Sequence, residues 1–144
     1  MFSKILSLFK SGEPPQDEFK HLILGSARWS GEDESWIGEY KGTRFSLAYE
    51  GRKSPDDELV AYALDILNDK VWVDSSIGEA KRQATAEFGP PYSDEISSLK
   101  LGTVHFYRHK GVGRIIADLE GGRDFRCWRI EWGGKKCEGI GFDT

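Results

Sequence analysis

Histidine and cysteine side chains have the chemistry to hold a transition metal, and in this 144-residue chain the candidates are His105, His109, Cys127 and Cys137. His105 and His109 are four positions apart, a spacing that brings two imidazoles together on a helix, but the residues around them alternate as in a strand. Cys127 and Cys137 do not form a C-x-x-C motif. The spacing therefore predicts no structural metal and no cofactor.

Nucleophilic catalysis and phosphate binding also lack a local signature. Serine, histidine and aspartate are all present, but no G-x-S-x-G or reactive-cysteine motif surrounds any of them. The G-x-G segments at 111–113 and 139–141 are not placed between a strand and a helix, as a phosphate loop requires, and they are typical of turns and strands. No residue is predicted to be catalytic. The lack of these motifs favours a non-enzymatic protein.

A run of carboxylates at 56–58 (Asp, Asp, Glu) directly follows Ser54 and Pro55. Serine is a preferred N-cap, proline suits the first helical position, and carboxylates are favourable in the first turn of a helix. Helix capping therefore explains these carboxylates better than a metal or acid–base site. The run at 32–34 (Glu, Asp, Glu) is expected in a solvated loop.

Aromatic residues are the strongest candidates for binding, because exposed rings often anchor protein interfaces. The chain has 5 Trp, 8 Phe and 5 Tyr. The candidate binding residues are Trp29, Trp36 and Trp132 with the acidic residues Glu32, Asp33 and Glu34. The favoured alternative is that Trp128 and Trp132, on one face of a strand, pack under helices. A pocket between helices and sheet is a further hypothesis; its candidate lining residues are Tyr62, Tyr92, His105, Arg126 and Trp128.

Hydrophobic periodicity predicts an α+β protein in which an antiparallel meander sheet packs two helices on one face. The expected strands are residues 19–24, which 25–29 would extend, and residues 36–40, 44–50, 99–109, 113–120, 125–132 and 135–142. The expected helices cover about 55–68 and 74–88, the second ending at Gly89-Pro90-Pro91.

The last hairpin is predicted from its charges. A two-residue turn at Gly133-Gly134 places Trp132 opposite Lys135, and it then pairs Glu131 with Lys136 and Arg129 with Glu138. This register puts the two cysteines on opposite faces of the hairpin, which forbids a disulfide between them. Both are therefore predicted to be free thiols.

The N-terminal segment is predicted to be separate from the main domain. Phe2, Ile5, Leu6 and Phe9 form one stripe of a short amphipathic helix over 2–10, which would dock on its own domain, a partner chain or a membrane surface. Residues 11–16 read as a linker, so the expected organisation is a helix and linker at 1–16 and a single α+β domain at 17–144. No signal peptide or membrane span is apparent, which predicts a cytoplasmic protein.

Charge is distributed unevenly along the chain. The net charge is -4; residues 1–99 carry a net -7 and residues 100–144 a net +3. An acidic chain with only a mildly basic C-terminal part is not expected to bind nucleic acid, which requires clustered Lys and Arg against phosphates.

Several short motifs resemble one uncharacterised bacterial family. They are Trp36-x-Gly38-x-Tyr40-x-Gly42, Phe45-Ser46-Leu47 and Gly139-Ile140-Gly141. Over residues 29–144 the chain resembles the family called domain of unknown function 2262, although Arg129-Ile130 stands where that family is expected to have a glycine-histidine pair. The resemblance implies a small α+β fold and no established activity, and it transfers no functional residue.

The leading hypothesis is a protein-binding module. Small acidic α+β proteins of this kind resemble the immunity proteins that neutralise bacterial toxins, in which negative charge steers the protein onto a basic enzyme. The alternative is a small-molecule-binding protein or enzyme with a pocket between helices and sheet. A third hypothesis is peripheral membrane attachment through residues 2–10.

Overall fold

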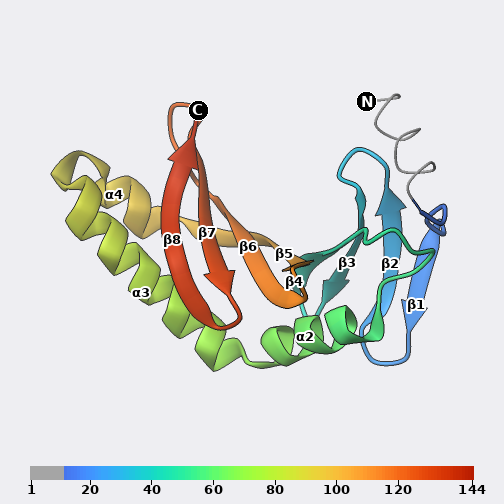
Figure 1. The fold of residues 1–144 in the computed structure, drawn as a ribbon. Helices are drawn as coiled ribbons and strands as arrows, with labels where there is room; N and C mark the ends of the chain where they lie inside the picture. Colours follow the sequence, from blue (N-terminus) through green and yellow to red (C-terminus); the bar gives the residue numbers. More distant parts are fainter. Residues whose placement is uncertain (1–11) are drawn as a thin grey trace.

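A sheet of eight strands and three helices make up residues 12–144, the part of the chain that the computed structural model describes (Figure 1). The strands are β1 (Glu18–His21), β2 (Gly25–Ser30), β3 (Ser35–Tyr40), β4 (Thr43–Ala48), β5 (Lys100–His109), β6 (Val112–Glu120), β7 (Cys127–Gly133) and β8 (Lys136–Asp143). The helices are α2 (Asp57–Asn68), α3 (Lys70–Phe88) and α4 (Pro90–Ser98). The α+β class is confirmed, whereas the helix expected at 2–10 lies outside the described residues.

The strands lie side by side in their chain order, from β1 to β8. All neighbouring pairs are antiparallel except β4 and β5, which are parallel. The purely antiparallel meander was therefore wrong at this pair. The three helices form a crossover between β4 and β5, and such a crossover returns the chain to the same end of the sheet, as parallel pairing requires.

One aspartate connects the first two helices. Asp69 is the C-cap of α2, and its side chain accepts a hydrogen bond from the Trp72 amide at 3.1 Å, which makes it the N-cap of α3. Helix α3 therefore begins four residues earlier than the predicted start at 74. The N-cap of α2 is Asp56, whose carboxylate accepts from the Glu58 amide at 2.8 Å, rather than Ser54.

The third helix, α4, was missed because Gly89-Pro90-Pro91 was interpreted only as the end of a helix. Gly89 has φ 84°, a left-handed conformation that ends α3, and the two prolines then occupy the first turn of α4. The first turn of a helix has no internal hydrogen-bond partner for its N–H groups, so proline is tolerated there.

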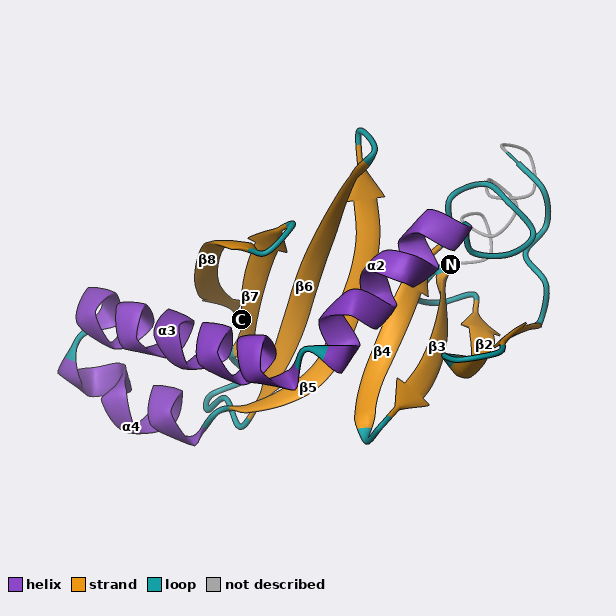
Figure 2. Ribbon diagram, turned by 90° about the horizontal axis from the view of Figure 1, so that it is seen from below, coloured by secondary structure: helices purple, strands orange, loops and turns teal. Residues whose placement is uncertain are grey.

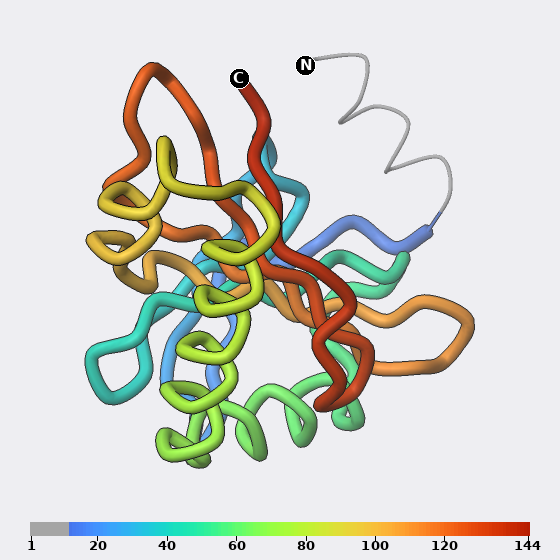
Figure 3. Tube along the Cα trace, turned by 90° about the vertical axis from the view of Figure 1, so that its left-hand side faces the viewer, coloured from blue at the N-terminus to red at the C-terminus, as the bar shows by residue number. Residues whose placement is uncertain are grey.

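The helices lie over one face of the sheet (Figure 2), and the core forms between them and the inward residues of the strands. Tyr62 of α2 packs edge-on against Phe106 of β5, with ring centroids 5.9 Å apart. Helix α3 runs alongside α4 and β8 (Figure 3). The opposite face of the sheet, called here the open face, carries no helix among the described residues.

The predicted register of the last hairpin was wrong. Gly133 faces Lys136, so the turn is at Gly134-Lys135, and a bulge follows between Glu131 and Trp132. The observed register pairs Trp128 with Phe142 and Ile130 with Ile140. Exposed ion pairs contribute at most about 1 kcal/mol each, whereas burying one large apolar side chain contributes roughly 1.5–3 kcal/mol, so apolar pairing determines the register.

The two cysteines are free in this hairpin. Cys127 is exposed and lies opposite Asp143, whereas Cys137 is half-buried and lies opposite Trp132. The two cysteines therefore lie at opposite ends of the hairpin. This distance along the hairpin separates the thiols further than a position on opposite faces of the sheet would.

Candidate functional site

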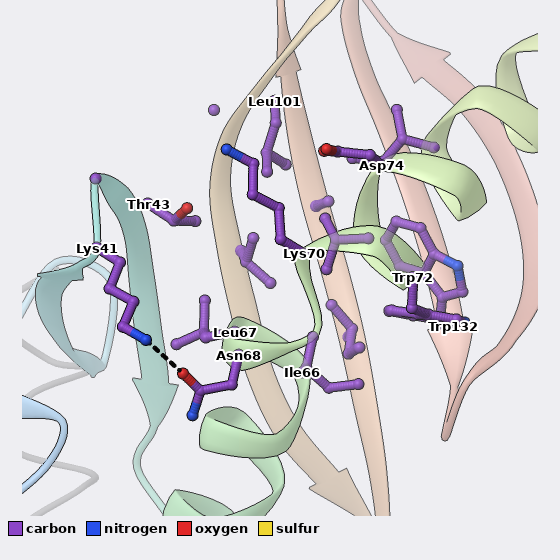
Figure 4. Close-up of a pocket in the computed structure, with 17 residues that line it drawn as sticks. Lys41, Thr43, Ile66, Leu67, Asn68, Lys70, Trp72, Asp74, Leu101 and Trp132 are labelled. Carbon is purple, nitrogen blue, oxygen red and sulfur yellow. Dashed lines mark hydrogen bonds between the residues drawn. The ribbon is translucent and has the colours of Figure 1, made fainter.

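A cavity of about 420 Å³ lies between the junction of α2 and α3 and the sheet (Figure 4). Its lining comes from the β3–β4 turn, the two helix ends and strands β4 to β7: Lys41, Gly42, Thr43, Ile66, Leu67, Asn68, Lys70, Trp72, Val73, Asp74, Ile77, Leu101, Gly102, Val104, Ile115, Ala117 and Trp132. A ligand-binding pocket between the helices and the sheet was one of the hypotheses drawn from the sequence. The cavity lies between these two layers.

The floor of the cavity is apolar because alternate residues of each strand face the helices. Val104, Ile115, Ala117 and Trp132 are all buried and line this floor. The Trp132 indole N–H donates to the Ser76 hydroxyl at 2.6 Å, so the ring is held in place across the end of the cavity.

The rim of the cavity carries most of its polar groups. Lys41 donates to the Asn68 amide oxygen at 3.1 Å (Figure 4). The Tyr40 hydroxyl donates to the same oxygen at 2.8 Å. Lys70 stands in the first turn of α3 and extends towards Leu101, and it makes no hydrogen bond or ion pair with any of residues 12–144. The N-terminal end of a helix carries a partial positive charge, which is unfavourable for a cation. A lysine at this position adds to that charge, so an anion bound beside it would be stabilised.

The buried carboxylate of Glu95 is a second polar centre, but its contacts make it structural. It accepts from Arg126 and, at 2.6 Å, from the Trp128 indole, and it also accepts from the Arg123 amide at 3.1 Å. These hydrogen bonds, with that of Arg126 the largest effect, lower the pKa of Glu95 from 4.5 to about 2. A carboxylate so fully paired is held ionised and has no group left for a ligand.

The five predicted pocket residues do not line the cavity. Tyr92, Arg126 and Trp128 gather around Glu95, where the Arg126 guanidinium lies 5.2 Å from the centre of the Tyr92 ring. The Tyr62 hydroxyl donates to the Gly134 carbonyl at 2.8 Å, and burial raises its pKa to about 12. His105 lies on the open face.

The tryptophans predicted as exposed anchors are mostly covered. From the sequence, one partly exposed anchor was predicted among Trp29, Trp36 and Trp132, and this is wrong for Trp36 and Trp132, which are 0% and 3% exposed. Trp29 is half-buried and packs edge-on against Trp36, with ring centroids 5.0 Å apart. The favoured alternative was correct for the strand that carries Trp128 and Trp132: their rings contact Phe88 and Trp72 of α3. Of the acidic loop, Glu32 and Asp33 are exposed and Glu34 is half-buried.

Sequence reasoning missed a hydrogen-bonded chain on the open face. The Ser46 hydroxyl lies 2.6 Å from Nδ1 of His105, whose Nε2 lies 2.7 Å from a carboxylate oxygen of Asp118. These residues come from β4, β5 and β6, so no local motif contains them. The only signal that could have found them is the parallel register that sets Ser46 opposite His105.

The rim residues of the cavity were missed for a different reason. Residues 69–73 were expected to be a loop between helices, whereas the structure continues almost directly from α2 into α3. The available signal for this early start was an N-capping residue, Asp69, followed shortly by the apolar run Val71-Trp72-Val73.

No cluster of three or more His, Cys, Asp and Glu side chains suited to a metal ion occurs within residues 12–144. The helices of that same range include none with the length and apolar character needed to cross a membrane. Comparison of the chain with protein-family models, with curated proteins and with solved structures found no match.

Proposed function

We propose that this protein binds a small amphipathic anion, such as a medium-chain carboxylate, in the cavity at the junction of α2 and α3. The observation that carries the proposal is the combination of an apolar floor with two lysines, Lys41 and Lys70, on the rim. An apolar chain would displace water from the floor, while a single anionic group would remain at the rim.

The size of the cavity supports this class of ligand. Its volume of about 420 Å³ is within the roughly 300–1,000 Å³ typical of small-molecule sites. Such sites combine apolar walls with a few polar groups that orient the ligand. The rim has two lysines and one aspartate, Asp74, so its charge balance favours a monoanion over a dianion.

The walls of the cavity are braced rather than free to collapse. Trp72 and Trp132 pack with their rings tilted at 56° and their centroids 5.9 Å apart, and Lys135 lies 5.8 Å from the centre of the Trp72 ring. Lys135 is itself paired with Asp69 at 3.3 Å, which ties the β7–β8 turn to the helix junction. A braced cavity lowers the cost of ordering side chains on binding.

The proposal is tested by titrating the full-length protein with decanoate in a calorimeter, with decyltrimethylammonium as the cationic counterpart. We expect decanoate to bind and the cation to bind much more weakly. Lys70→Gln should weaken decanoate binding roughly tenfold, because a hydrogen bond to a charged group contributes about 1.5 kcal/mol or more. Lys100→Gln, an exposed lysine outside the cavity, is the matched control. Equal binding of both amphiphiles, or no effect of Lys70→Gln, contradicts the proposal.

Protein binding is a second candidate function, favoured by the β6–β7 loop. Phe125 is 93% exposed there and has φ 62°, a conformation that side chains rarely adopt. The next residue, Arg126, is fixed by Glu95, so the ring is presented from a rigid base. Affinity capture with wild-type protein and Phe125→Ser as bait tests this function: a stoichiometric partner lost with Phe125→Ser supports it, and a capture unchanged by that substitution counts against it.

Membership of the domain of unknown function 2262 family also remains a proposal. One of its motif positions has a physical reason in this fold: a Cβ added at Gly38 would lie 2.7 Å from the Phe45 ring, so the Trp-x-Gly spacing is needed for β3 and β4 to pack. Localisation in the cytoplasm, and membrane attachment through residues 2–10, are proposals that liposome flotation and cell fractionation would test.

A further inference from the structure

We propose that Ser46, His105 and Asp118 form a catalytic site on the open face of the sheet, which hydrolyses small carboxylic esters that carry a positive charge. This activity is separate from ligand binding in the helix–sheet cavity, because the two sites lie on opposite faces of the sheet and share no residue.

The three side chains have the order and contacts of a nucleophile, a base and an orienting carboxylate. The Ser46 hydroxyl is 2.6 Å from Nδ1 of His105, and Nε2 of His105 is 2.7 Å from Asp118. Hydrogen bonding to His105 is the largest effect that lowers the pKa of Asp118, and Arg129, at 3.3 Å, lowers it further. An ionised Asp118 can only accept, so Nε2 carries the proton and Nδ1 presents its lone pair to Ser46.

The sheet holds this arrangement rigidly. Ser46 and His105 are direct partners in the parallel pairing of β4 with β5, and Asp118 lies on the next strand, β6. Sites built on strands keep their geometry better than sites on loops. Ser46 is only 4% exposed, so its hydroxyl is shielded from bulk water and depends on His105 as its partner.

A cavity of about 250 Å³ gives access to both Ser46 and His105. Its wall includes two acidic residues, Asp33 and Glu34, which favour a substrate with an ammonium group over an anionic one. Tyr107 also lines the cavity, and its hydroxyl oxygen accepts a hydrogen bond from Arg114 at 3.3 Å.

The reaction uses only the ester and water. Ser46 transfers its proton to Nδ1 of His105 as its oxygen bonds to the ester carbonyl carbon, and the ester C–O bond then breaks as the alcohol leaves with that proton. Water next attacks the acyl-serine; His105 takes a proton from the water and returns it to Ser46 as the acid is released. No electrons are exchanged with a second reagent.

The first test is covalent labelling of the full-length protein with 4-(2-aminoethyl)benzenesulfonyl fluoride, a cationic reagent, followed by peptide mass spectrometry. We expect one adduct, at Ser46, formed as the oxygen–sulfur bond replaces the sulfur–fluorine bond. His105→Gln should slow labelling by about 10²–10⁴-fold, the range typical of a general base. Ser35→Ala is the matched control, because Ser35 lines the same cavity and is buried to the same degree as Ser46, at 5% against 4% exposed.

Urea denaturation of His105→Gln shows whether the variant is folded before its labelling is compared, and the unfolded wild-type chain should lose the reactivity of Ser46. The second test is turnover of alanine ethyl ester, which is cationic, against ethyl acetate. We expect the cationic ester to be hydrolysed faster, and Asp33→Asn to reduce that preference. A wild-type protein that is not labelled at Ser46, labelling independent of His105, or no ester turnover would each overturn the proposal and leave the three residues as a polar ladder across the sheet.

Discussion

Helix α3 meets the sheet in contrasting ways at its two ends. At its C-terminal end the space is filled: Phe88, Trp128 and Phe142 pack with ring centroids 4.8 to 5.6 Å apart. At its N-terminal end Trp72 and Trp132 pack at 5.9 Å, and a cavity of about 420 Å³ remains beside them.

Both ends use a tryptophan of β7 whose indole N–H reaches a partner at 2.6 Å. Trp128 donates to the carboxylate of Glu95, and Trp132 donates to the hydroxyl of Ser76. The first bond involves a buried charge and the second a neutral hydroxyl, so the filled end should contribute more to stability. The comparison indicates that one end of the helix–sheet interface holds the fold together, while the other leaves the open space that the proposed ligand would occupy.

Removing the buried carboxylate should produce the largest effect. Glu95 is 2% exposed, and Glu95→Ala leaves the Trp128 indole without its acceptor and the Arg126 guanidinium with only the exposed Asp124, at 3.5 Å. We expect a loss of about 3–5 kcal/mol in the free energy of unfolding, as for other broken buried pairs, measured by urea denaturation. A loss below about 1 kcal/mol would show that the filled end does not depend on this charge.

Acid should act on the same group. The pKa of Glu95 is about 2 in the folded state and near 4.5 when unpaired, so its contribution is fully present above pH 4.5 and is lost as the pH falls towards 2. This difference corresponds to about 3 kcal/mol of stability at neutral pH. Glu95→Gln should flatten the fall in stability between pH 4.5 and 2, followed by denaturation at each pH. An unchanged acid profile in this variant would refute the assignment.

The two tryptophans of β7 form a matched pair. Trp128→Phe removes a donor to a buried charge and leaves a void among packed rings, so we expect a loss of about 2–3 kcal/mol. Trp132→Phe removes a neutral hydrogen bond beside an existing cavity, so a loss of about 1 kcal/mol is expected. Thermal unfolding of both variants measures the difference. Equal losses would remove the distinction between the ends.

Replacing a buried alanine with leucine should affect stability differently in packed and hollow regions, and in the hollow region it should have the smallest effect on stability of the changes described here. Ala63 of α2 and Ala117 of β6 are 0% and 1% exposed, but only Ala117 lines the cavity. Ala63→Leu should cost about 1–3 kcal/mol through overpacking, whereas Ala117→Leu should be nearly neutral because the added atoms enter the cavity. Ala117→Leu should also weaken decanoate binding, which calorimetry would show; a destabilised Ala117→Leu would indicate that the cavity is not open space.

The sequence was sufficient for the class of fold and for most strands, because alternation and glycine turns are local signals. It predicted burial of Trp128 and Trp132 correctly for the same reason. The parallel pairing of β4 with β5 was not predictable, because no local sequence pattern indicates which strand the chain will pair with after three helices. That pairing places Ser46 beside His105, so the site on the open face could not be predicted either.

The hairpin register shows a second limit. Charge pairs at Glu131 and Arg129 suggested one register, but the apolar pairs that pack beneath α3 and α4 determine another. Only the three-dimensional structure shows which side of β8 the helices cover. The rim lysines were hidden for a related reason, because their significance depends on a cavity formed by five separate segments of chain.

The central claim, that the hollow end of α3 binds a ligand and the filled end does not, is tested most directly by following the five tryptophan indole N–H signals in a ¹⁵N–¹H spectrum during a decanoate titration. We predict that the signals of Trp72 and Trp132 shift together and saturate, while those of Trp128, Trp36 and Trp29 stay in place. No shift at any indole, or shifts at Trp128 equal to those at Trp132, would contradict the account.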